Sequence, residues 1–274
     1  MGLQIATNVG ALNAYRNLSV NQNDVSKSLE KLSSGLRINR AADDAAGLAI
    51  SEGLRSQVNG LNVAARNAQD GISVIQTAEG ALTEVHSILQ RVRDLAVQAG
   101  SDSNNADSRT AIKTEIDALG DELTRVAAST NFNGIKLLNS GDTLTFQVGA
   151  GSTAAEDQID VTLTDFSGLG AAVKALTVDT AANSLTTIAA IDTQITNVST
   201  ARAGFGAVQN RFESTINSLQ VSAENLSAAK SRIADTDMAA EMVKYTASNI
   251  LQQAGTAMLA QANQSGQGVL QLLR

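Results

Sequence analysis

The amino-acid sequence predicts a mainly α-helical protein, built from long heptad-repeat helices with one small β-hairpin region. Three observations support this fold class. Apolar residues recur at seven-residue intervals over most of the 274 residues, one central stretch alternates with a period of two, and proline is absent. An average proline content of about 5% would give roughly 14 prolines in such a chain. Because proline removes a backbone donor and clashes with the preceding helical turn, its absence favours long uninterrupted helices.

The first two apolar runs predict helices in the N-terminal part of the chain. Leu18, Val25 and Leu32 are spaced by seven, and Leu29 and Leu36 take the alternate positions. A longer run predicts a helix over about residues 45–100, with seven-residue positions at Leu54, Leu61, Ala68, Ile75, Leu82, Leu89 and Ala96. Such heptads are typical of helices that pack along a seam, as in coiled coils and bundles.

Two further runs predict helices over about residues 105–130 and 185–234. The third run alternates steps of four and three from Ile112 to Val126, and the polar, turn-prone segment 101–107 precedes it, which predicts a helical hairpin. The fourth run keeps a seven-residue step at Ile191, Val198, Phe205, Phe212, Leu219, Leu226 and Ile233. An unbroken helix here is about 70 Å long, and its sustained heptad predicts a left-handed supercoil.

The region of about residues 131–182 is predicted to be rich in strands. The segment NFNG at 131–134 ends the third helix. Apolar residues then alternate with polar ones in two short stretches, at Leu144, Phe146 and Val148 and at Ile159, Val161 and Leu163. This pattern predicts two strands joined by a Gly- and Ala-rich loop around residues 149–157. Residues 165–184 have low complexity, and their pattern leaves both a loop and a helix open.

The two chain ends, residues 1–40 and 236–274, are amphipathic but irregular. They are rich in Asn, Gln, Ala and Ser, and Met238, Met242 and Tyr245 form one apolar stripe. Such segments bury too little apolar area to offset the entropy lost on ordering them. We therefore expect the ends to be disordered in a lone monomer and helical against partners, which is typical of a self-assembling subunit.

Composition argues against several classes of function. The absence of cysteine excludes disulfide scaffolds, thiol nucleophiles and cysteine-ligated metals, and a single histidine, His86, argues against a histidine metal site or a serine–histidine triad. A net charge of −7 argues against a nucleic-acid binder. No apolar stretch approaches the roughly 20 residues of a membrane span, and no cleavable secretory signal is recognisable. We expect no enzyme activity, no cofactor and no metal.

The acidic pair Asp43–Asp44 and the single histidine, His86, each have two competing interpretations. Asp43 and Asp44, beside Arg37 and Arg40, could form a paired-carboxylate site. General acid–base catalysis needs a cleft that raises one pKa, so a solvated or salt-bridged bend is the favoured interpretation. His86 falls at the edge of the second heptad seam, where a packed helical histidine is favoured over a ligand.

Six long motifs occur in one order along the chain. They are LSSGLRINRAADDAAGLAIS at 32–51, NAQDGISVIQ at 67–76, QRVRDLAVQ at 90–98, NFNGIKLL at 131–138, SRIADTD at 231–237 and ILQQAGTAMLAQANQSGQGVLQLLR at 250–274. In these motifs the chain resembles bacterial flagellin, the subunit of the flagellar filament. One departure is that the family usually carries proline near the ANQ segment, where this chain has Ser265–Gly268.

The resemblance implies a division into two domains. Residues 1–42 and 236–274 would pair into an inner coiled-coil domain, and residues 43–235 would form a rod-like helical bundle with the strand-rich region. Because only about 50 residues separate Asn131 from the fourth helix, the resemblance implies a minimal flagellin without outer domains. The inner-domain packing residues would be Ile5, Leu12, Leu18, Val25, Leu29, Leu32, Met238, Met242, Tyr245, Ile250, Leu251, Met258, Leu270 and Leu273. The rod core would be Leu54, Leu61, Ile75, Leu82, Leu89, Val198, Phe205, Phe212, Leu219, Leu226 and Ile233.

The resemblance also implies partners and a location. The chain would form a helical homo-oligomer outside the cell, exported by the flagellar apparatus without a cleavable signal peptide. Its partners would be a cytosolic flagellin chaperone, the filament cap, the hook-associated proteins and a vertebrate innate immune receptor, with Gln90, Arg91, Leu95 and Glu115 as the receptor contacts. The alternative is a hook–filament junction protein of the same architecture.

Overall fold

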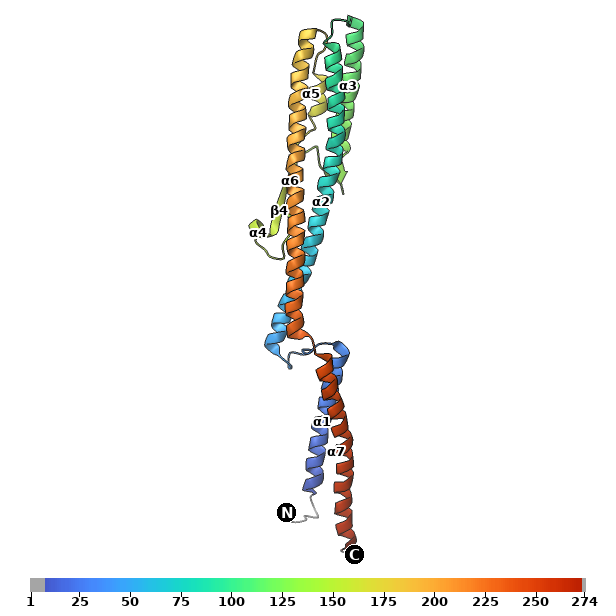
Figure 1. Ribbon diagram of the computed structural model, residues 1–274, viewed down its shortest axis with the longest axis vertical. Helices are drawn as coiled ribbons and strands as arrows, with labels where there is room; N and C mark the ends of the chain where they lie inside the picture. The colour runs from blue at the N-terminus through green and yellow to red at the C-terminus, as the bar shows by residue number, and fades with distance from the viewer. Residues whose placement is uncertain (1–7, 273–274) are drawn as a thin grey trace. The chain divides into compact units, whose positions relative to one another are not determined.

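The computed structural model describes residues 8–272, and these residues fall into two compact units (Figure 1). The two ends of the chain, up to Ser56 and from Asn225 onward, form one unit, called here the terminal unit. Gln57–Glu224 form the other, the central unit. The predicted domain boundaries at 42/43 and 235/236 fall in the connectors between helices, whereas the compact units divide further along helices α2 (Ala45–Ala99) and α6 (Ala181–Ala234).

The terminal unit is a helical pair made from both ends of the chain. Helix α1 (Val9–Ser34) lies antiparallel to helix α7 (Met238–Leu272) (Figure 1). The Asn8 side chain caps α1 by accepting a hydrogen bond from the Ala11 amide, and Gly35 ends α1 in the left-handed conformation at φ 73°. A residue with a Cβ rarely adopts this conformation, which explains why α1 stops at a glycine.

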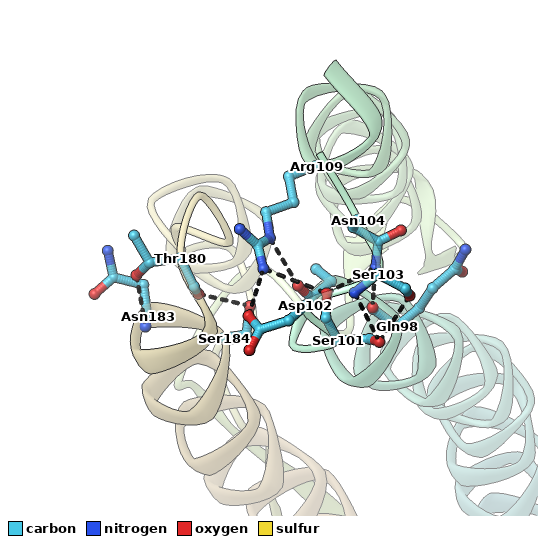
Figure 2. Close-up of polar contacts among 10 residues, drawn as sticks. Gln98, Ser101, Asp102, Ser103, Asn104, Arg109, Thr180, Asn183 and Ser184 are labelled. Atoms are coloured by element: carbon cyan, nitrogen blue, oxygen red, sulfur yellow. Dashed lines mark hydrogen bonds and ion pairs between the residues drawn. The ribbon is translucent and has the colours of Figure 1, made fainter. Parts of the chain in front are cut away.

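The central unit packs helix α3 (Ala106–Ser129) into one core with the C-terminal part of α2, from Gln57, and the N-terminal part of α6, up to Glu224. Asn105 caps α3, because its side-chain oxygen accepts from the Ser108 amide at 2.8 Å. The turn between α2 and α3 is held by Asn104, which donates to the Gln98 carbonyl at 2.6 Å, and by Arg109, whose Nε donates to the Ala99 carbonyl at 3.0 Å (Figure 2). The predicted helical hairpin is therefore confirmed.

Two small antiparallel sheets follow α3. Strands β3 (Thr143–Gln147) and β4 (Gln158–Thr162) pair with Phe146 opposite Ile159, which confirms the two predicted strands. The loop between them also contains the short helix α4 (Ala154–Asp157). Strands β1 (Asn131–Phe132) and β2 (Ile135–Lys136) were not predicted; they flank a two-residue turn in which Asn133 and Gly134 have positive φ, as a type I′ hairpin requires.

The sequence of residues 165–184 left both a loop and a helix open, and the structure contains both. Helix α5 (Leu169–Lys174) packs on α3, a loop follows, and α6 begins at Ala181. The helices approach closely because both contact positions are glycines. A Cβ added at Gly170 would collide with the Gly120 carbonyl and with Thr124, and one added at Gly120 would lie 3.1 Å from the Gly170 carbonyl. Between residues 130 and 181 the chain holds only these strands and short helices, so no outer domain is inserted there.

The core of the central unit follows the predicted heptads only in part. Six predicted positions are fully buried: Ile75, Leu82, Leu89, Val198, Phe205 and Phe212. Leu219 lies at the edge of the core, whereas Leu54, Leu61, Leu226 and Ile233 are only half-buried. The rings of Phe212 and Phe146 meet edge to face, with centroids 5.6 Å apart. The predicted fold class, long heptad helices with a small β-hairpin region, is confirmed.

Candidate assembly surface

The contact between α1 and α7 is a heptad seam of small and polar side chains. Its positions are half-buried or buried at alternating steps of three and four: Ala11, Ala14, Leu18, Asn21, Val25, Ser28 and Leu32 on α1, and Glu241, Tyr245, Ser248, Gln252, Gly255, Leu259 and Ala262 on α7. Leu18 packs on Gly255, where an added Cβ would lie 3.3 Å from its Cδ1. The pair therefore uses few of its large apolar side chains to hold itself together.

Most large apolar side chains of the terminal unit point away from this seam. Twelve of the seventeen exposed large apolar side chains among the described residues belong to it: Val9, Leu12, Tyr15, Val20, Leu29, Ile50, Met238, Met242, Val243, Ile250, Leu251 and Met258. Val243 is 72% exposed. Within residues 8–264, Ile38 and Ala234 are the only buried hydrophobic side chains of this unit. Exposed apolar surface on this scale is typical of a protein–protein contact.

The fourteen predicted inner-domain packing residues divide into three groups. Leu12, Leu29, Met238, Met242, Ile250, Leu251 and Met258 are exposed, and Leu18, Val25, Leu32 and Tyr245 lie half-buried in the seam. Leu270 lies within α7, and Ile5 and Leu273 lie outside the described residues. The sequence pattern did not separate the seam from the outward face, because both contain leucine and the seam is mostly Ala, Ser, Gly, Asn and Gln.

The acidic pair at 43–44 caps backbone amides. One Asp43 carboxylate oxygen accepts from the amides of Arg40 at 3.0 Å and Asn39 at 3.1 Å, and these bonds lower the pKa of Asp43. Asp44 accepts from the Gly47 amide at 2.8 Å in the first turn of α2. Arg40 is paired with Glu30 at 2.9 Å. The two carboxylates therefore stabilise a bend, as favoured from the sequence, and the pKa of Asp43 is lowered, whereas a general acid would need a raised pKa.

The predicted receptor surface needs a correction at Leu95. Arg91 forms two hydrogen bonds with the Glu115 carboxylate, at 3.0 and 2.6 Å, and all three of Gln90, Arg91 and Glu115 are exposed. Gln90 also contacts His86, with 2.9 Å between the two Nε2 atoms. Leu95, however, is 2% exposed and belongs to the helical core. Leu95 lies beside the buried residues Val92 and Ala96 of α2 and is covered with them, so it is not part of this surface.

A metal site and a membrane-spanning helix each require a feature that residues 8–272 lack. Within residues 8–272, no three acidic or histidine side chains are grouped as metal ligands. None of the helices in that range combines the length and apolar character needed to cross a bilayer.

Family models and known proteins give one consistent match. The model described as bacterial flagellin N-terminal helical region matches residues 5–143, and the bacterial flagellin C-terminal helical region matches residues 188–273. A flagellin of Halalkalibacterium halodurans is 53% identical over 268 residues, covering 97% of this chain and 98% of the relative. A flagellin of Bacillus subtilis is 48% identical over 307 residues, covering 99% and 100%.

A solved structure agrees with these sequence matches. The crystal structure of Bacillus cereus flagellin superposes with a TM-score of 0.50 at 33% identity, over 60% of this chain and 94% of the other. Two family models that together span most of the chain, and relatives matched over nearly their full length, establish the family. The chain belongs to the bacterial flagellins, and it is a structural subunit that self-assembles helically into the flagellar filament.

Proposed function

We propose that the outward apolar side chains of α1 and α7 are buried between neighbouring subunits, and that their burial drives elongation of the filament. The observation that supports this is the concentration of exposed large apolar side chains in the terminal unit, beside a seam that leaves them free. Fully burying one such side chain contributes about 1.5–3 kcal/mol. The two helices would belong to an inner coiled-coil domain made of residues 1–42 and 236–274, and the contact between subunits would be made by this domain.

Seeded polymerisation followed by electron microscopy tests this proposal. Purified protein is mixed with short filament seeds in a precipitating salt, and the critical concentration for elongation is measured. Ile250→Gln should raise that concentration about tenfold or more, because 1.4 kcal/mol corresponds to a factor of ten. The matched control, Ile250→Leu, keeps the apolar side chain and should elongate like the parent. Equal critical concentrations for the Gln and Leu variants would refute the proposal.

The same experiment separates the filament subunit from the alternative, a hook–filament junction protein. Long uniform tubes should grow from the seeds. A junction protein would instead remain dispersed or would cap the seeds without extending them. Family membership supports the filament subunit and gives no support to the junction protein.

The same apolar face is suited to a cytosolic chaperone before export. A chaperone that covers Met242, Ile250 and Met258 would prevent premature polymerisation, because it would occupy the surface that neighbouring subunits need. We propose further that the chain leaves the cell through the flagellar export apparatus without a cleavable signal, and that it meets the cap and the hook-associated proteins at the growing structure. Its role is structural, without enzyme activity.

Gln90, Arg91 and Glu115 form the proposed contact with a vertebrate innate immune receptor. Because Arg91 and Glu115 are paired, the receptor would bind a surface on which a positive and a negative charge are already fixed. Arg91→Ala and Glu115→Ala should each lower receptor activation by monomers without changing the melting temperature. Leu95→Ala should act differently, by opening a core cavity that costs about 2–5 kcal/mol. Parent-like activation by both charge variants would contradict the proposed contact.

A further inference from the structure

The two connectors of the terminal unit are bonded to each other. Leu36 and Asp235 form an isolated antiparallel bridge. The Arg37 amide donates to the Ala234 carbonyl at 2.7 Å, and the Thr236 amide donates to the Gly35 carbonyl at 3.0 Å. We call residues 35–38 and 233–236 the clasp.

The Arg37 side chain adds a third cross-connection to the clasp. Its Nη2 donates to the Ile233 carbonyl at 2.6 Å, although the two residues are 196 positions apart in the sequence. The last carbonyls of a helix have no partner within the helix, so Arg37 supplies the cap that α6 lacks.

The clasp also holds the buried apolar residues of its unit. Ile38 is 3% exposed and Ala234 is 4% exposed. Ile38 fits against Gly47 in the first turn of α2, where an added Cβ would lie 2.7 Å from the Ile38 Cδ1. Up to residue 264, the α1–α7 seam itself contains no fully buried apolar side chain. The clasp is thus the best-packed part of the terminal unit.

The row of α7 residues opposite Leu18, in contrast, does little to select one alignment of α1 against α7. The α7 positions that face Leu18 at one-heptad intervals are Ser248, Gly255 and Ala262, and all three are small. A slip of seven residues, about 10 Å along the helix, would therefore set Leu18 on another small residue. A hydrophobic seam specifies its register only where the opposing side chains differ in size or polarity.

The polar residues of the seam do not select the register either. Within residues 8–264, Asn21, Ser248 and Gln252 make no side-chain hydrogen bond across the seam, and the buried Ser28 Oγ and Glu241 Oε1 have no partner. The hydrogen bond that does cross the pair runs from Asn8 to the Ala262 carbonyl. A backbone carbonyl is present at every position of α7, so this bond can form in other registers.

We propose that the clasp sets the register of α1 against α7, with Arg37 as its positioning residue. Both helices leave the clasp at fixed points, α1 ending at Ser34 and α7 beginning at Met238, so the bridge between Leu36 and Asp235 determines which turns lie side by side. The register in turn decides which apolar residues of the two helices are neighbours on the outward face.

A cysteine-crosslinking experiment on the full-length chain tests the register, since the chain has no cysteine of its own. In the parent structure, a Cβ at Gly255 lies 3.9 Å from the Leu18 Cβ, within the range of about 3.5–4.5 Å for a disulfide. The pair Leu18→Cys with Gly255→Cys should therefore crosslink on mild oxidation at least tenfold more than Leu18→Cys with Ala262→Cys.

The decisive variant is a tandem duplication of Val25–Lys31, which inserts one heptad between Leu18 and the clasp. If the clasp sets the register, the duplication moves Leu18 one heptad further along α7, and the preferred crosslink changes from position 255 to position 262. If the preferred crosslink remains at position 255, the seam sets the register and the proposal is overturned. A parent chain without any preference overturns it as well. Because the chain ends are expected to be helical only against partners, each variant is copolymerised as a minor component with the parent chain, and the crosslink within one subunit is read on a non-reducing gel.

Arg37→Ala tests the positioning residue. It should reduce the tenfold preference for position 255 to about threefold or less, with the helix content of the central unit unchanged by circular dichroism. Arg40→Ala is the matched control in the same connector, because Arg40 pairs with Glu30 and makes no bond to residues 233–236. It should keep the full preference. A tenfold preference retained in Arg37→Ala would overturn the role assigned to Arg37.

Discussion

Gly71 and Gly80 lie in the same helix, α2, but Gly71 is packed against another side chain and Gly80 is not. A Cβ at Gly71 would lie 2.8–3.2 Å from three atoms of the Phe212 ring, whereas a Cβ at Gly80 would have no neighbour within 4 Å. Gly71→Ala should overpack the core and cost about 1–3 kcal/mol. Gly80→Ala should stabilise the helix by up to about 1 kcal/mol, since alanine restricts the unfolded backbone. Thermal melting of the two variants should give shifts of opposite sign; a shared sign would contradict the close packing of Phe212 on Gly71.

The stability of the folded chain should depend on pH through the carboxyl group of Asp43. The amides of Arg40 and Asn39 lower its pKa in the folded chain below the ordinary value of 3.8. A carboxyl with a lowered pKa stabilises the folded state above its unfolded pKa, and that contribution is lost as the pH falls through the folded value. Asp43→Asn should therefore melt below the parent at pH 7, and the difference should shrink below pH 3.8. Melting curves of the parent and of Asp43→Asn between pH 7 and below pH 3.8 check this prediction. A difference in melting temperature that grows on acidification would contradict it.

At the scale of elements, one arginine makes several of the bonds that hold the turn between α2 and α3. The Arg109 side chain is largely buried and donates to the carbonyls of Ala99 and Ser101 and to Asp102 (Figure 2). Arg109→Ala leaves the last carbonyls of α2 without these donors, at a cost of about 1–3 kcal/mol. Amide hydrogen exchange should accelerate at the end of α2 and the start of α3. Arg55→Ala, which removes an exposed pair within one helix, should change little.

The sequence predicted the long helices because their heptads are repeated many times, so a single irregular position cannot hide the period. Short elements have no such redundancy. The β1–β2 hairpin occupies six residues, and its Asn-Gly turn was the one local signal that could have identified it. For residues 165–184 the sequence left a loop and a helix open, because helix α5 is stabilised by the approach of Gly170 to Gly120, a contact that depends on the tertiary structure.

The candidate site could be predicted in location but not in detail. Irregular amphipathic ends rich in small polar residues drew attention to α1 and α7, where most of the exposed large apolar side chains of the described residues lie. The period alone could not show that small residues form the seam while Met242, Ile250 and Leu251 remain exposed. Leu95 was placed on a surface by family resemblance, whereas the structure buries it in the core, one residue away from the heptad position Ala96. The clasp was not foreseen, because it joins two segments that are nearly 200 residues apart in the sequence.

At the scale of the whole molecule, the two units differ in what stabilises them. Among the described residues, every buried apolar side chain except Ile38 and Ala234 belongs to the central unit. Deleting residues 236–274 should therefore leave the central unit folded, with a cooperative melting transition, and should abolish both polymerisation and chaperone binding. Circular dichroism, sedimentation and a pull-down with the chaperone measure the three properties. Loss of the melting transition would show that the central unit depends on α7.

The pairing of α1 with α7 also means that the terminal unit cannot form before synthesis of the chain is nearly complete. The hydrogen bond from Asn8 to Ala262 closes a loop of 254 residues, so α1 leaves the ribosome long before its partner helix exists. At about 5–20 residues per second, α1 waits roughly 10–50 s for α7. Contacts within the central unit are more local and can form in that interval. A chain whose translation stops early lacks α7 altogether, so only completed chains present the paired surface to a growing filament.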